Sequence, residues 1–63
     1  MSAIKELKIM DLGRYLIGRN ENLNVGHRMI ANPQQITRQY LGMCAGVLRD
    51  RNARRMAAEL SRM

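Results

Sequence analysis

The apolar positions of residues 32–63 follow helical spacing, but they change sides half-way along the stretch. At about 100° per residue, the apolar residues of the first half share one face. They are Ile36, Tyr40, Met43, Cys44, Val47 and Leu48. The apolar residues of the second half centre on the opposite face, and they are Ala53, Met56, Leu60 and Met63. One straight helix therefore cannot bury a single apolar stripe over the whole stretch.

Asn32 and Pro33 predict where this helical stretch begins. An asparagine side chain accepts a backbone N–H of the first turn, and proline fits the first helical position because that residue needs no N–H partner. Gln35 stands three residues after Asn32, which is the reciprocal position of a capping box. We therefore expect a long C-terminal helix over about residues 33–62.

Two arrangements reconcile this helix with its change of face. In one, the chain breaks near residues 49–52, and Asp50 or Asn52 caps a second helix. In the other, the helix is continuous and uses both faces, so that the small residues around Gly46 admit a neighbouring helix. Neither Gly nor Pro stands in residues 49–52 to force a break. The pattern therefore favours the continuous helix.

The N-terminal third predicts a second helix over about residues 3–17, with Ser2 as its N-cap. Gly18 is placed to end it, because glycine accepts the left-handed conformation that closes many helices. Residues 19–24 are rich in side chains that favour turns, and residues 25–30 form either a further helical turn or an extended piece.

The chain of 63 residues is expected to be one small all-α domain, residues 1–63. We expect the face with Ile36, Tyr40 and Val47 to pack on residues 3–17, so that Val47→Asp should unfold the protein. One cysteine and one histidine provide neither an internal disulfide nor a zinc site, and no metal or cofactor is expected. The sequence also lacks a glycine-rich phosphate loop, which argues against an enzyme.

A core this small usually needs additional stabilisation, and association with a second copy would supply it. We therefore predict a homodimer with a shared helix face on the long helix. The expected dimer or partner interface consists of Gly42, Ala45, Gly46, Ala53, Met56 and Leu60.

Arginines give the sharpest functional signal, because the net charge is +6 and they cluster near the C-terminus. The expected nucleic-acid-binding residues are Arg51, Arg54, Arg55 and Arg62. Guanidinium groups bind phosphates bidentately, and such a face can follow a duplex backbone. The alternative is a solvated face partly neutralised by Asp50 and by Glu59, which stands four residues after Arg55. A break near Asp50 would allow a helix-turn-helix, although residues 49–52 lack its usual glycine.

No segment predicts a membrane span or a secretory signal. The longest strongly apolar uncharged run covers residues 39–48, about half of a span. We therefore expect a cytoplasmic protein with no membrane partner.

Three functions follow from these features. The first is a small, basic, non-enzymatic regulatory protein that binds nucleic acid as a dimer through the arginines. The second is a protein-binding modulator or inhibitor that docks on a larger partner through its Met-rich helix. The third is a structural subunit of a larger assembly.

Overall fold

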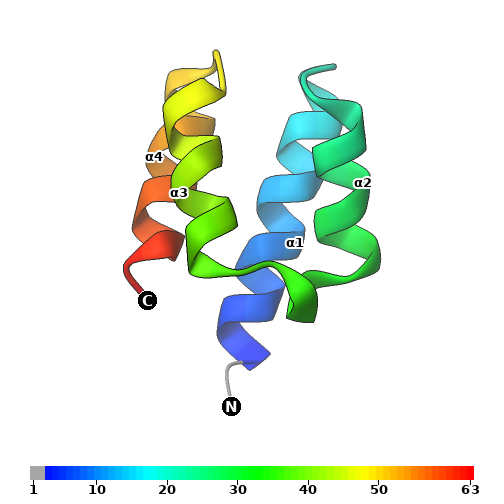
Figure 1. Ribbon diagram of the computed structural model, residues 1–63. Coiled ribbons are helices and arrows are strands. Elements are labelled where there is room, and N and C mark those ends of the chain that lie inside the picture. The colour runs from blue at the N-terminus through cyan, green and yellow to red at the C-terminus, as the bar shows by residue number, and fades with distance from the viewer. Residues whose placement is uncertain (1–2) are drawn as a thin grey trace.

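Two helical hairpins lie against each other in the computed structural model, which describes residues 3–63 (Figure 1). Helices α1 (Ala3–Gly18) and α2 (Leu23–Ala31) form the first hairpin, and α3 (Arg38–Val47) and α4 (Arg51–Ser61) form the second. A short 3₁₀ helix, η1 (Pro33–Gln35), lies in the connection. No strand occurs in this part of the chain, so the predicted all-α fold is confirmed.

Helix α1 confirms the predicted N-terminal helix, while Ser2 lies outside the described residues. The helix ends differently from the prediction, because Asn20 and not Gly18 adopts the left-handed conformation, with φ 56°. The N–H of Glu21 donates to the carbonyl of Leu16 at 2.9 Å, and the N–H of Asn20 donates to Ile17 at 3.0 Å. These two bonds form a Schellman motif, in which asparagine can replace glycine.

Helix α2 fits closely on α1 because two glycines face each other. A Cβ atom at Gly13 would lie only 2.7 Å from the carbonyl oxygen of Gly26, and one at Gly26 would lie 3.0 Å from that of Gly13. Of the two alternatives for residues 25–30, the helix is the one observed, as part of α2.

The predicted start of the long helix is wrong. Asn32 makes no side-chain capping bond, and Pro33 begins only the three residues of η1. Ile36 then takes extended backbone angles and is buried, with 6% of its surface exposed. Helix α3 begins at Arg38, where the Thr37 hydroxyl accepts the N–H of Tyr40 at 3.0 Å.

The predicted continuity of the long helix is also wrong, and the alternative with a break and an Asp50 cap is the one observed. Leu48 and Asp50 both have extended backbone angles, which any residue adopts, so this turn needs no glycine. The Oδ1 of Asp50 accepts the N–H of Ala53 at 3.0 Å and caps α4. The break lets both halves of the stretch turn their apolar faces toward one core.

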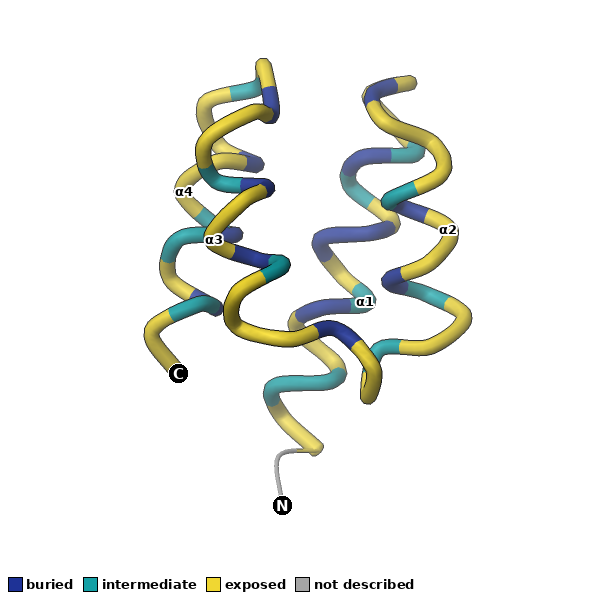
Figure 2. The backbone as a smooth tube through the Cα atoms, viewed as in Figure 1, coloured by how far each residue is buried: buried dark blue, intermediate teal, exposed yellow. Residues whose placement is uncertain are grey.

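That core lies between the hairpins, as the buried segments in Figure 2 show. Its buried apolar residues are Ile9, Leu12, Leu16, Met29, Ile36, Leu41, Cys44, Leu48, Ala53, Ala57 and Leu60. The expected packing face is therefore partly wrong. Ile36 is buried and Tyr40 packs against the core, but Val47 is 70% exposed. Cys44 and Leu48 of the predicted face are buried, whereas Met43 is 65% exposed, and Leu41 joins the buried side of α3.

None of the helices in the described part of the chain combines the length and the apolar character that crossing a membrane would require.

Candidate nucleic-acid interface

Helix α4 and its C-cap carry the four predicted arginines on the solvent side. We call Arg51, Arg54, Arg55 and Arg62 the arginine face. All four residues are exposed, and Arg62 follows directly at the C-cap. At helical spacing these positions fall within about 100° of one another. The buried side of α4 is opposite them and consists of Ala53, Ala57 and Leu60. The arginine face therefore points away from the core.

The arginine face is not neutralised by neighbouring acids. None of its four members takes part in an ion pair among residues 3–63. Arg55 donates from Nη2 to the Oδ1 of Asn52 at 3.0 Å, rather than pairing with Glu59 one turn later. The positive charge of this face is therefore available to an anion.

The position of the arginines in α4 is unfavourable for the helix itself. Arg51, Arg54 and Arg55 lie within its first five residues, close to the positive end of the helix dipole. A cation at that end lowers the stability of the helix by about 0.3–1 kcal/mol, because unpaired backbone N–H groups already make that end positive. Helix stability alone does not explain three arginines at these positions.

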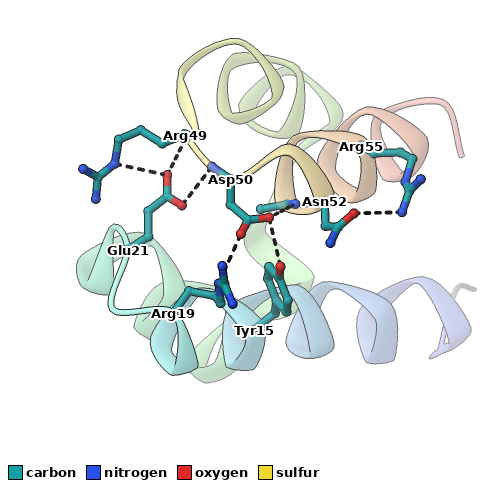
Figure 3. A network of polar contacts seen from close by, with 8 residues as sticks. Tyr15, Arg19, Glu21, Arg49, Asp50, Asn52 and Arg55 are labelled. Atoms are coloured by element: carbon teal, nitrogen blue, oxygen red, sulfur yellow. Dashed lines mark hydrogen bonds and ion pairs between the residues drawn. The ribbon is translucent and has the colours of Figure 1, made fainter.

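Two carboxylates, those of Glu21 and Asp50, offset the positive charge at the N-terminal end of α4. Figure 3 shows them between the hairpins. Glu21 is buried, with 6% of its surface exposed. Its Oε2 accepts the backbone N–H of Arg49, and its Oε1 accepts that of Asp50 at 3.2 Å. Because Glu21 follows α1 in the first hairpin, these bonds hold the two hairpin turns together.

Asp50 completes this junction. Besides capping α4, its Oδ1 accepts the hydroxyl of Tyr15 at 2.9 Å, and its Oδ2 lies 3.2 Å from the Nε of Arg19 (Figure 3). The pKa of Asp50 is lowered chiefly by the N–H of Ala53. Burial opposes this effect, while Tyr15, Arg19 and the N–H of Asn52 lower the pKa further. The carboxylate therefore stays charged and fixes α4 to α1, which orients the arginine face. We call the contacts of Glu21 and Asp50 the carboxylate clamp.

The sequence predicts only one of the two carboxylates of the clamp, that of Asp50. The position of Asp50 before a helical stretch predicts a cap, but the role of Glu21 depends on residues 28 and 29 positions further along. No local pattern marks Glu21, which lies among the turn-forming residues after α1.

The predicted interface residues do not share one exposed face, because that face assumed a continuous helix. Ala53 and Leu60 are in the core of the protomer, and Met56 and Ala45 are partly buried. Gly42 and Gly46 lie on the exposed side of α3, where an added Cβ would meet no atom within 4 Å. Dimerisation itself stays a prediction.

The remaining chemistry-bearing residues are isolated. Cys44 is buried on α3, and burial raises the pKa of its thiol, so that it behaves as a small core residue. His27 lies exposed on α2. Residues 3–63 contain no group of three or more His, Cys, Asp or Glu side chains placed to hold a metal ion.

No protein-family model matches the sequence, and no curated protein or solved structure is significantly similar to it.

Proposed function

We propose that this protein is a small basic regulator that binds nucleic acid as a dimer, with the arginine face of α4 on the phosphate backbone. The observation that carries the proposal is the set of four exposed guanidinium groups on one helix face, none of which is paired with an acid in the described part of the chain. Unpaired guanidinium groups at the positive end of a helix provide a site for phosphate oxygens.

A duplex fits this face better than a single strand. Single-strand sites stack bases on aromatic side chains, whereas the only aromatic residues are Tyr15 and Tyr40, which lie on other helices. Helix α4 has 11 residues and is about 16 Å long at 1.5 Å per residue. Several phosphates of a duplex backbone lie within that length.

The test is a binding titration of fluorescent duplex DNA and duplex RNA by anisotropy, at several salt concentrations from about 50 to about 200 mM. We expect affinity to fall steeply with salt, because phosphate contacts release counterions. Replacing Arg51, Arg54 and Arg55 by Ala should weaken binding and reduce the slope of log K against log salt by about 2–3.

A matched variant controls for total charge. Replacing Lys5, Arg14 and Arg38 by Ala removes the same three charges from α1 and the start of α3. This control should keep most of the affinity and of the salt slope. Equal losses in both variants, or undetectable binding of wild type to either duplex at about 50 mM salt, would reject the arginine face as the binding site.

A second candidate function has its own observation. Met43 and Val47 are 65% and 70% exposed one turn apart on α3, whose residues from Gln39 to Val47 carry no charge. This surface suits a protein-binding modulator that docks on a larger partner through the exposed side of α3 around Met43. Loss of a captured host protein after Met43→Glu, with no duplex binding by wild type, would favour this function.

A further inference from the structure

A groove of about 230 Å³ lies between α1 and the C-terminal end of α4. We call it the α1–α4 groove, and its lining residues are Lys8, Asp11, Met56, Glu59, Leu60 and Met63. Lys8 and Asp11 form the α1 wall, while the other residues form the α4 wall and its C-terminal extension. Apolar side chains make up most of the α4 wall.

Exposed apolar side chains surround this groove. Ile4 and Leu7 are 65% and 58% exposed, and they lie one turn before Lys8 and Asp11 on the same side of α1. Met63 is 52% exposed on the other wall. Half of the large apolar side chains that are exposed among residues 3–63 therefore gather around one groove. Such a concentration is typical of an interaction surface.

The charges of the groove indicate which partner fits it. Lys8 on one wall and Glu59 on the other have opposite signs, and neither takes part in an ion pair among residues 3–63. Glu59 is also the only acidic residue of α4. In a two-fold interface every contact occurs twice. A second copy of the chain would therefore form two ion pairs, each between Lys8 of one copy and Glu59 of the other.

We propose that the α1–α4 groove is the homodimer interface, in which Lys8 of each copy pairs with Glu59 of the other. Ile4, Leu7 and Met63 then cover the apolar wall of the facing groove. This inference rests on the dimeric form of the proposed function and replaces the α3 face of Gly42 and Gly46. Met56 remains part of the interface.

The proposed interface has a consequence for the arginine face. Glu59 lies one turn from both Arg55 and Arg62 on α4, so the interface borders the arginine face. In the reciprocal Lys8–Glu59 pairing, α1 of each copy faces α4 of the other, so the arginine face of each copy stays exposed on the outer side of its α4. The dimer would then present two separate arginine faces, one from each copy.

The test is a pair of charge reversals read by sedimentation equilibrium without nucleic acid. Lys8→Glu alone and Glu59→Lys alone each place like charges opposite each other twice, so each dimer should dissociate at least about tenfold more readily than wild type. An equal mixture of the two variants should restore the dimer as a heterodimer, because both pairs are then opposite in sign. Lys8→Glu lowers the net charge from +6 to +4, so its loss of dimer cannot come from overall repulsion.

Gly46→Leu is the control for the competing α3 face, and circular dichroism confirms that each variant is folded. This variant should leave the dimer intact. A monomeric wild type at high micromolar concentration, a mixture that stays monomeric, or dissociation caused by Gly46→Leu would overturn the proposed interface. A monomer that still binds duplex through the arginine face would leave that site standing, whereas a dimer that binds no duplex would reject only the proposed function.

Discussion

The glycines of this protein have different structural roles, depending on where they lie in the fold. Gly13 and Gly26 lie where the backbones of α1 and α2 meet, so neither position has room for a side chain. Gly42 and Gly46 face open space on α3 and have no positive φ that would require glycine. Only the first pair is required by the fold of the protomer.

We therefore expect alanine to have opposite effects at the two kinds of glycine. Gly13→Ala should lower the free energy of unfolding by about 1–3 kcal/mol, because its Cβ would collide with the backbone of α2. Gly46→Ala should raise it by about 0.5–1 kcal/mol, because alanine loses less backbone entropy in a helix. Urea unfolding followed by circular dichroism measures both. A Gly13→Ala variant as stable as wild type would show that α1 and α2 can separate without cost.

At the scale of elements, the turn at residues 48–50 determines which side of each helix is buried. Leu48 leaves the helical path of α3 and is 2% exposed, although its neighbour Val47 is 70% exposed. The turn also changes the direction in which the side chains of α4 point, so that Ala53, Ala57 and Leu60 pack in the same core as Leu41. A short turn thereby reconciles two apolar faces that one helix could not bury together.

Substitutions of Leu48 and Val47 should have very different effects on the free energy of unfolding, because only Leu48 is buried. Leu48→Ala should cost about 2–5 kcal/mol, because it leaves a cavity between the hairpins. Val47→Asp should change the free energy of unfolding by no more than about 0.5 kcal/mol, since the side chain stays in water. This expectation reverses the one drawn from the sequence. Thermal unfolding of both variants measures the difference, and an unfolded Val47→Asp variant would contradict the exposed position of Val47.

For the whole molecule, the carboxylate clamp is a polar connection between the two hairpins. Tyr15, Arg19 and Glu21 belong to the first hairpin or its turn, whereas Asp50 belongs to the second. The apolar core between the hairpins is small, so this connection contributes to their relative orientation. It also fixes the helix that carries the arginine face.

The clamp should make stability depend on acid pH. Because the pKa of Asp50 is lower in the folded protein than in the unfolded chain, its contribution is complete above the ordinary carboxyl pKa of about 3.9. The contribution is lost as the pH falls through the lower, folded pKa. Asp50→Asn should therefore be less stable at neutral pH and should lose less stability than wild type between about pH 5 and pH 2.

Melting temperatures measured across this range provide the test. Glu6→Gln is the control, because Glu6 lies outside the groove and takes part in no ion pair among residues 3–63. Its melting curve should follow that of wild type more closely than the Asp50→Asn curve does. Identical pH profiles for Asp50→Asn and wild type would remove Asp50 from the acid response.

The sequence by itself determined the features that depend on neighbours a few positions apart. Helix-forming residues with few breakers gave the all-α class and α1, and the spacing of the four arginines gave the arginine face of α4. These features hold whether or not the helix continues through residues 48–50, because a helix face is set within two or three turns.

Only the tertiary structure decided where the second hairpin turns and which side of it is buried. Asn32 and Pro33 have the local signature of a helix start, but burial of Ile36 moves that start to Arg38. Residues 49–52 contain no breaker, but the turn allows both apolar faces to join one core. A buried Glu21 accepts the backbone N–H groups of Arg49 and Asp50 in that turn. Both outcomes depend on contacts between residues far apart in the chain, because local helix signals are weak compared with burial of the core.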